Sequence, residues 1–283
     1  MGHECYGHDP RVAWKRVTNS ARLFFQLDRI DAILASYPKS GRTWFRFILS
    51  SYLVSLFGLD PALDLHSTFT VMPNFDLDPA RGLPAFGFAD HLPPVPLIAV
   101  SHRPYSRLWF HQRPIIYMLR DPRDVLVSSY FHATRQKHRF SRDIDAFLND
   151  PAQGVAGLTD YLNGWAAGLK RNSHIVLSYE KLSQDPISET ARVLTFLGLE
   201  VKPNLLAAAV EAARFQNMQK LELSKGLPGH HYDRSDGESL RMRRGQVGGF
   251  VDYLTPAQIA QIDAACNRRL TGNAKALLAS TRS

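Results

Sequence analysis

The feature that most constrains the fold is a short apolar run followed by a helical pattern, which recurs along the chain. The runs have the length of strands and are too short for buried helices. They span residues 31–37, 96–100, 115–119 and 174–177. Strands that alternate with helices predict an open parallel sheet with helices on both faces. We therefore expect an α/β fold in which one domain, residues 1–283, has a central parallel sheet flanked by helices.

Glycine, proline and aspartate mark the expected helix ends. After the first run, residues 38–41 form a turn, and apolar residues then recur at helical spacing until Gly58, which is a natural stop. After the third run, Asp121 is typical of an N-cap and Pro122 of a first helical position. That helix should continue to about Arg135.

Polar or cationic residues follow all four expected strands. They are Lys39 and Ser40, His102, Arg120 and Tyr179. Open α/β sheets bind ligands beyond the carboxyl ends of their strands. The sequence therefore predicts a ligand site built from these strand ends.

The charge of the chain favours anionic partners. Its 34 Lys and Arg exceed 26 Asp and Glu, which gives a net charge of +8. This balance suits nucleic acid, an anionic surface or a ligand with several phosphates, and does not choose among them.

Two cysteines, Cys5 and Cys266, exclude a zinc cluster or a disulfide framework. The most apolar stretch, residues 45–57, is too short to span a bilayer, so we expect a cytoplasmic protein without membrane insertion.

The turn after the first strand carries the residues of a phosphate site. Free N–H groups at a helix N-terminus bind phosphate, and Gly41 allows the backbone to approach closely. Lys39 adds a mobile cation, and Ser40 and Thr43 add hydroxyl donors. The Walker A spacing is absent. A tight turn that only caps a helix is the alternative, and the order of residues favours phosphate binding.

Three motifs resemble those of the soluble sulfotransferases, which take a sulfonate group from 3′-phosphoadenosine 5′-phosphosulfate (PAPS). Tyr-Pro-Lys-Ser-Gly-Arg-Thr-Trp at residues 37–44 resembles their 5′-phosphosulfate loop. Residues 117–130 are similar to their 3′-phosphate segment, in which an arginine and a serine hold that phosphate. Arg-Arg-Gly-Gln-Val-Gly at residues 243–248 resembles their late motif over the same phosphate. The resemblance covers roughly residues 32–253 and implies a P-loop-like strand–loop–helix.

The resemblance implies a donor site with adenosine 3′,5′-bisphosphate as the product. Its weaker elements are a Tyr-Glu pair at residues 179–180 and a Phe-x-x-Met element at residues 215–218, and both would lie near the adenine. Trp44 offers a flat face on which the adenine can stack. The donor-binding residues that the resemblance implies are Lys39, Ser40, Gly41, Arg42, Thr43, Trp44, Arg120, Ser128, Tyr179, Phe215, Arg243, Arg244 and Gly245.

The resemblance also implies a mechanism without a metal ion. His102 would be the base that deprotonates an acceptor hydroxyl, or less favourably an amine. Lys39 would stabilise the leaving phosphate, and Ser128 would hold Lys39 off the donor until the acceptor arrives. His91 and His111 are alternatives to His102, which is preferred because it ends a strand.

Other charged residues are interpreted as surface features. We expect Arg123 and Asp124 to be a solvated or paired helix start, and the basic residues 135–142 to be a solvated face. His230 and His231 are assigned to a flexible surface loop.

Some positions depart from the family pattern and leave the acceptor open. Arg42 replaces a small hydroxyl residue, and it can contact the donor or the acceptor. Such departures favour a bacterial-type branch. Acceptor contacts are expected from the irregular segments 60–96 and 224–238, for a small-molecule, lipid or glycan hydroxyl. The oligomeric state is left open.

Three alternatives remain at this point. A nucleotide kinase needs magnesium ligands and a Walker-type loop, and neither is evident. A nucleic-acid-binding protein would explain the charge, but no recognition motif supports it. A degenerate sulfotransferase could bind the donor as a regulatory module only.

Overall fold

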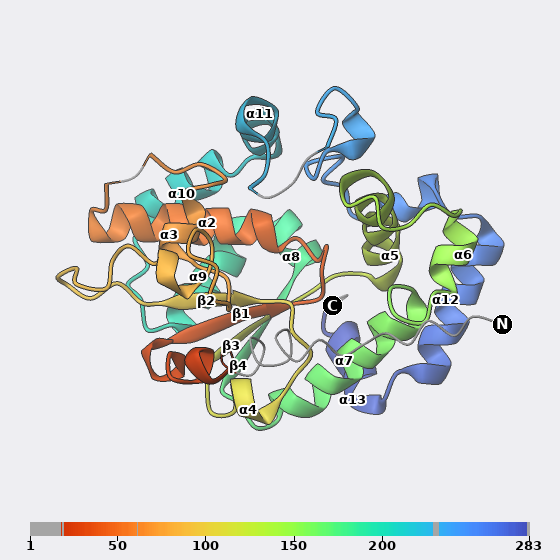
Figure 1. The fold of residues 1–283 in the computed structure, drawn as a ribbon, viewed down its shortest axis with the longest axis horizontal. Helices are drawn as coiled ribbons and strands as arrows, with labels where there is room; N and C mark the ends of the chain where they lie inside the picture. The colour runs from red at the N-terminus through yellow and green to blue at the C-terminus, as the bar shows by residue number, and fades with distance from the viewer. Residues whose placement is uncertain (1–17, 19, 61, 229–231, 282–283) are drawn as a thin grey trace.

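Four parallel strands form the centre of the structure in the order β2-β1-β3-β4 (Figure 1). The computed structural model describes residues 18, 20–60, 62–228 and 232–281. The strands are β1 (Ala32–Ser36), β2 (Ile98–Ser101), β3 (Ile115–Leu119) and β4 (His174–Ser178). Each lies within or next to one of the four apolar runs, so the predicted parallel sheet is confirmed.

Helices cover both faces of this sheet (Figure 1). The longer ones are α2 (Arg42–Phe57), α5 (Pro122–Phe131), α7 (Val155–Leu169), α9 (Pro186–Phe196), α10 (Pro203–Ala212), α11 (Phe215–Lys225), α12 (Pro256–Arg269) and α13 (Gly272–Ala279). Shorter ones are α3 (Thr68–Val71), α4 (Arg107–Phe110), α6 (Ile144–Leu148) and α8 (Tyr179–Gln184). Single turns are η1 (Leu27–Arg29), η2 (Leu83–Ala85), η3 (His132–Gln136), η4 (Gly237–Ser239) and η5 (Gly249–Asp252).

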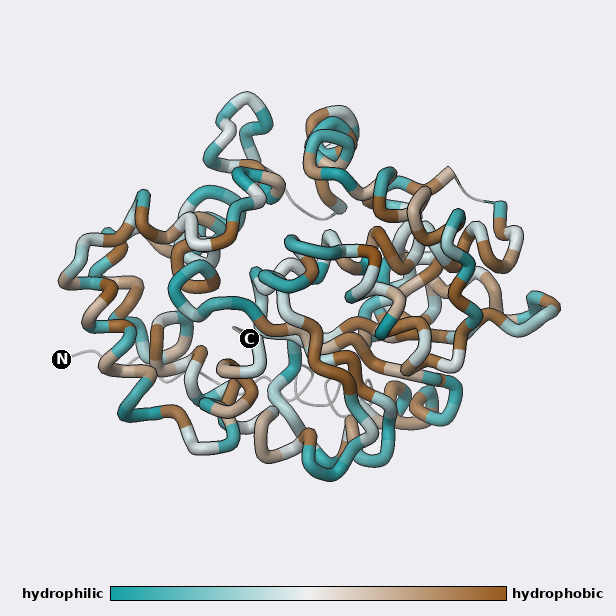
Figure 2. The backbone as a smooth tube through the Cα atoms, turned by 180° about the vertical axis from the view of Figure 1, so that it is seen from behind, coloured by the Kyte–Doolittle hydropathy of each residue, from teal (hydrophilic) through white to brown (hydrophobic). Residues whose placement is uncertain are grey.

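The alternation of side chains along β1 divides the core into two layers. Ile33 and Ala35 face a cluster that includes residues of α7, α12 and α13. Ala32 and Leu34 face the opposite cluster, which includes residues of α2, α9 and α10. Both faces of a parallel sheet are buried in this way, and therefore its strands are continuously apolar. Figure 2 shows the hydrophobic segments gathered in the interior.

The predicted helix ends agree with the structure. Gly58 ends α2 with a φ of 63°, and the Asp121 side chain accepts a hydrogen bond from the N–H of Arg123 at the start of α5. The α-helical part of that helix stops at Phe131, and a turn of different type continues it to Gln136, close to the expected end at Arg135. This is the π-helical turn η3, in which the N–H of Lys137 donates to the oxygen of His132, 3.0 Å away.

Both predicted irregular segments are mostly loop. Among the described residues of 60–96 the only helical elements are α3 and η2, and residues 224–238 begin in the last turn of α11 and end in η4. The predicted surface loop at His230 and His231 lies outside the described residues. In the part of the chain that the structure describes, no helix has the length and apolar character needed to cross a membrane.

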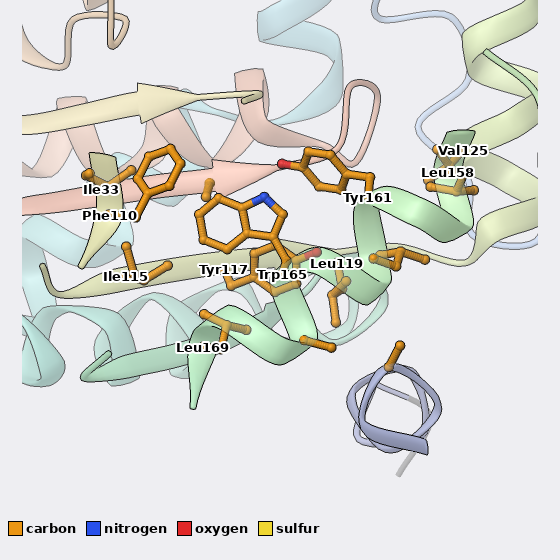
Figure 3. Packing of buried hydrophobic residues seen from close by; sticks show 14 of the residues in the cluster. Ile33, Phe110, Ile115, Tyr117, Leu119, Val125, Leu158, Tyr161, Trp165 and Leu169 are labelled. Atoms are coloured by element: carbon orange, nitrogen blue, oxygen red, sulfur yellow. The ribbon is translucent and has the colours of Figure 1, made fainter. Parts of the chain in front are cut away.

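The layer beneath the sheet is built around Trp165 of α7 (Figure 3). Its indole stacks on Tyr117 of β3, with ring centroids 5.1 Å apart, and its ring centroid lies 4.9 Å from that of Phe110. The indole N–H donates to the oxygen of Arg103, 3.0 Å away. This contact satisfies the polar end of an otherwise buried ring.

We predict that Phe110→Ala destabilises the protein by about 3–5 kcal/mol, because the change leaves a cavity beside Trp165. Chemical denaturation measures the effect. Phe25→Ala is the matched control, since that ring is 77% exposed, and it should change the free energy of unfolding by less than about 0.5 kcal/mol. Equal effects of the two substitutions would contradict the proposed core.

Candidate functional site

The strand order reverses between β1 and β3, and the site lies at this reversal. β1 pairs with β2 on one side and with β3 on the other. The loops after β1 and β3 therefore leave in opposite directions and open a crevice at the carboxyl edge. Arg120, which follows β3, donates to the oxygen of Lys39, which follows β1, over 3.4 Å.

The loop between β1 and α2 has a strained, closely packed backbone. Lys39 and Gly41 have positive φ angles of 72° and 94°. A Cβ atom at Gly41 would lie 2.3 Å from the Tyr179 ring, so glycine is required there. No side chain caps α2, and the N–H groups of Arg42 and Thr43 have no acceptor among the described residues. These two groups can therefore bind an anion.

An apolar cavity of about 280 Å³ adjoins this loop. Trp44, Tyr179, Phe215 and Met218 line it, from α2, α8 and α11. The Trp44 ring is fixed by its N–H, which donates to the oxygen of Ala213, 2.9 Å away. The structure thus brings together the aromatic residues that the resemblance assigns to the adenine. Their flat faces suit a heteroaromatic ring.

A small cavity of about 50 Å³ lies on the other side of Gly245, which lines both cavities. Arg120, Ser128, Arg243 and Arg244 also line it. Two sequence segments, 120–128 and 243–253, which are more than a hundred residues apart, therefore converge on one cationic pocket. Forked guanidinium groups suit the oxygen atoms of a phosphate.

Asp124 holds this cationic pocket together. Its carboxylate accepts hydrogen bonds from the N–H groups of Gly248 (2.9 Å) and Phe250 (3.0 Å) and lies 3.5 Å from Arg120. The side chain is buried. Of the two expected alternatives, a solvated or a paired helix start, the structure therefore shows the paired one, with Asp124 beside Arg120 and Arg123 paired with Asp121 at 2.6 Å.

Several of the late arginines are already paired with acidic groups. Arg243 donates to Glu238 over 3.1 Å and to the Tyr253 hydroxyl, and Arg244 pairs with Asp252.

Ser40 differs from the other residues of the loop between β1 and α2. It is buried and lines neither the apolar cavity, nor the cationic pocket, nor the second large cavity that opens from this loop.

A second large cavity, of about 380 Å³, opens from the same loop. It shares five lining residues with the apolar cavity. These residues are Lys39, Arg42, Thr43, His102 and Arg241. They form the junction between the two cavities, and a group held there can face a ligand in each cavity. Arg42 lines both sides, so the structure does not assign it to only one of them.

His102 has the tautomer of a base at the junction. Its Nδ1 lies 2.8 Å from the oxygen of Ser36, and a carbonyl only accepts, so Nδ1 carries the proton. Nε2 is therefore left with a free lone pair. Burial, with a further contribution from the charge of Arg42, lowers the pKa of His102 well below its usual value. The imidazole is neutral at pH 7.

The two alternative histidines lie elsewhere. His91 has Nδ1 2.9 Å from the oxygen of Pro93, and its ring packs against Phe57 and Phe88. His111 is exposed at the end of α4. Neither lines the cavities at the junction.

The cations at the junction raise one another's energy. Burial lowers the pKa of Lys39 well below its usual value, and the nearby charge of Arg241 lowers it further. Burial and Arg241 also lower the pKa of Arg42, to about 9. An anion bound here would relieve this repulsion. In the described part of the chain, no group of three or more His, Cys, Asp or Glu is placed to hold a metal ion.

The sequence analysis missed Arg241 and His132. Arg241 donates to the Thr43 hydroxyl over 2.9 Å, and its backbone N–H donates to Glu222, 2.7 Å away. His132 begins η3, and its Nδ1 lies 2.6 Å from the amide oxygen of Gln136. Neither residue belongs to a motif. Arg241 does lie just before the late motif, and that position was the available signal.

His132 makes stability sensitive to acid. Burial and the charge of Lys39 lower the pKa of His132 to about 3, whereas in the unfolded chain it has its ordinary value of about 6.5. Between these values the unfolded chain binds the proton and the folded chain does not. Acid therefore favours unfolding over this range, by about 2 kcal/mol at pH 5.

We predict that His132→Asn loses less stability than the unchanged protein between pH 7.5 and pH 5, by about 2 kcal/mol. Urea denaturation at both pH values measures the difference. His66→Asn, at an exposed position, is the control and should keep the full loss. An equal loss in the His132 variant would show that this group titrates normally in the folded state.

The fold is similar to those of solved sulfotransferase structures. The mouse sulfotransferase SULT7A1 in complex with PAP matches with a TM-score of 0.62 and 21% identity, over 93% of this chain and 95% of that chain. A retinol dehydratase in complex with androsterone and the inactive cofactor PAP matches with a TM-score of 0.58 and 20% identity, over 86% and 81%. These likenesses concern the fold.

The sequence is similar to curated sulfotransferases. Cytosolic sulfotransferase 15 of Arabidopsis thaliana is 28% identical over 88% of this chain and 74% of its own length. The 3-alpha-hydroxysteroid sulfotransferase of Cavia porcellus is also 28% identical, over 86% and 84%. The family model described as the sulfotransferase domain matches residues 29–274. With that match over most of its length, the chain belongs to the sulfotransferase family.

Proposed function

We propose that this sulfotransferase takes a sulfonate group from PAPS and transfers it to a hydroxyl group of a small-molecule acceptor. The observation that carries the proposal is the order in which three binding regions lie along the crevice. A cationic pocket and a cationic loop lie on either side of an apolar cavity lined by aromatic rings. PAPS has the same order of groups, with a phosphate, an adenosine and a phosphosulfate.

A buried N–H group without a partner in the cationic pocket supports PAPS as the donor. The Nε atom of Arg120 is buried and has no hydrogen-bond partner among the described residues. ATP and ADP lack a 3′-phosphate and would leave Arg120 and Ser128 without a ligand. The cationic pocket therefore disfavours the nucleotide kinase, and family membership disfavours it as well.

We propose the following roles at the junction. Nε2 of His102 accepts the proton of the acceptor hydroxyl, because its other nitrogen is held by Ser36. The ammonium of Lys39 donates to the oxygen on which charge develops when the sulfonate leaves. PAPS supplies an activated sulfonate whose leaving group is a phosphate.

Ser128 is assigned to the 3′-phosphate rather than to Lys39. It lines the small cavity with Arg120, whereas Lys39 lines the two larger cavities. No hydrogen bond joins Lys39 to Ser128 in the described structure. Control of Lys39 by Ser128 stays a prediction that depends on a state with donor bound.

We further propose that residues 1–283 act as one catalytic unit in the cytoplasm. The match of the sulfotransferase domain to residues 29–274 and the name of the Arabidopsis relative support this placement. The bacterial-type branch stays a prediction from the departures in sequence.

We predict that His102→Asn lowers kcat at least about a hundredfold and leaves the affinity for adenosine 3′,5′-bisphosphate within about twofold, because the base contacts the acceptor and not the adenosine. Turnover is measured with labelled PAPS, and affinity by calorimetry. His91→Asn is the matched control and should keep full turnover. Unimpaired turnover in the His102 variant would overturn its assignment as the base.

We predict that Arg120→Ala weakens binding of adenosine 3′,5′-bisphosphate by about 10–100-fold, since it removes charged hydrogen bonds to the 3′-phosphate. Calorimetric titration measures this loss. Arg192→Ala removes an arginine paired with Glu189 and should leave affinity unchanged. Arg120→Lys should bind with intermediate affinity, because it keeps the charge and loses the fork. Unchanged affinity in Arg120→Ala would refute the assignment.

A further inference from the structure

The larger cavity is lined by positive charge without matching negative charge. Its lining contains seven Lys and Arg side chains and two histidines, and no Asp or Glu among the described residues. The seven cations are Lys39, Arg42, Arg46, Arg81, Lys137, Arg139 and Arg241. Carboxylates outside the lining, Asp76 and Glu222, act on some of them from a distance.

The donor accounts for only part of this charge. Lys39, Arg42 and Arg241 also line the apolar cavity, so a phosphosulfate group at the junction reaches them. The other four cations, Arg46, Arg81, Lys137 and Arg139, line the larger cavity and not the apolar one. Their charge is therefore directed at whatever occupies the acceptor side.

Two of these four already have partners within the protein. Arg46 is buried, donates to the oxygen of Met72 and to Asn74, and lies 4.0 Å from the centre of the Phe69 ring. Arg81 pairs with Asp78 at 3.0 Å. These contacts make them part of the wall of the cavity.

Lys137 and Arg139 have no such partners. No described residue accepts a hydrogen bond from either side chain or forms an ion pair with it. Both follow the π-helical turn η3, and the N–H of Arg139 donates to the oxygen of Ala133, 2.9 Å away. This backbone contact turns the chain back onto η3, and both side chains line the cavity, Lys137 half-buried and Arg139 exposed. The expectation of a solvated face therefore holds for Arg139, whereas Lys137 is only partly exposed.

The charges on this side act on one another. Burial lowers the pKa of Lys137, and the charges of Arg139, Arg241 and Arg81 lower it further. A neutral acceptor would take water away from these groups and give no charge in return, which is costly. An anionic group on the acceptor would offset that cost and form charge-assisted hydrogen bonds.

We propose that the natural acceptor is itself an anion: a hydroxylated small molecule with an acidic group, a carboxylate, sulfonate or phosphate, that binds Lys137 and Arg139 while its hydroxyl faces His102. The inference rests on the proposed function, since it names the substrate class of the same site. The aromatic rings of Phe69 and Phe147 line the same cavity and can pack on the apolar part of such a molecule.

The test compares phenols that carry different acidic groups, or a neutral amide, opposite the hydroxyl. The protein is saturated with adenosine 3′,5′-bisphosphate and titrated with 4-hydroxybenzoate, 4-hydroxybenzenesulfonate, 4-hydroxyphenyl phosphate and the neutral 4-hydroxybenzamide. We expect at least one acid to bind about tenfold tighter than the amide, or more. The acid with the largest preference identifies the acidic group. If no acid is preferred over the amide, including the case in which none binds, the proposal is overturned.

Paired variants locate the preference. The double variant Lys137→Gln/Arg139→Gln should reduce the preference for the acid to less than about threefold, because the two charges are removed. The control, Lys170→Gln/Arg171→Gln, removes one exposed lysine and one exposed arginine after α7 and should leave the preference unchanged. A preference that persists in the first variant contradicts the assigned binding residues.

The two proposals fail in different ways. If adenosine 3′,5′-bisphosphate itself does not bind, the donor assignment fails, and the same titrations of the free protein still test the anionic acceptor. If it binds and no acid is preferred, only the acceptor proposal fails. If an acid is preferred, its turnover with PAPS shows whether the bound acid is sulfonated.

Discussion

Mutual repulsion among cations at the carboxyl edge of the sheet is the constraint on which the site depends. The strand reversal between β1 and β3 places Lys39 and Arg120 within one hydrogen bond of each other. Burial lowers the pKa of Lys39, and neighbouring arginines lower it further. The fold tolerates this arrangement because two buried packed layers hold the sheet from both sides. Bound anions then become part of the electrostatic balance of the site.

The packing of the loop makes this edge specific. Gly41 has no side chain, and the Tyr179 ring fills the space that this leaves. The guanidinium of Arg120 lies 4.2 Å from the centre of that ring and lines the small cavity. One aromatic ring thus lies between the apolar cavity and the cationic pocket. Asp124 of α5 accepts hydrogen bonds from the N–H groups of Gly248 and Phe250. The pocket therefore forms only when segments far apart in sequence pack together.

Local patterns were sufficient to predict most of the fold. The four apolar runs became strands, and Gly58 and Asp121 mark helix ends, because buried strands and helix caps are determined by a few adjacent residues. The motif residues that follow strands were predicted for the same reason. Parallel pairing then brings these strand ends together without further information.

Long-range contacts explain what the sequence did not reveal. His132 and Lys137 enter the cavity because α5 gives way to a π-helical turn, and nothing in their spacing indicates that change. The backbone N–H of Arg241 donates to Glu222 of α11, and the burial of Asp124 depends on backbone groups of the late segment. Such partners are set by tertiary packing, so a helix pattern alone does not show that Asp124 is buried or that Lys137 and Arg139 line a cavity.

The most direct test of the account is a comparison of adenosine 3′,5′-bisphosphate with ADP by calorimetric titration of the unchanged protein. Both ligands carry adenosine and two phosphates, and they differ in where the second phosphate is attached. The account predicts that the 3′,5′-bisphosphate binds about a hundredfold tighter, a difference of about 2.7 kcal/mol, because only it reaches the pocket of Arg120 and Ser128. Equal affinity for the two ligands would contradict the account.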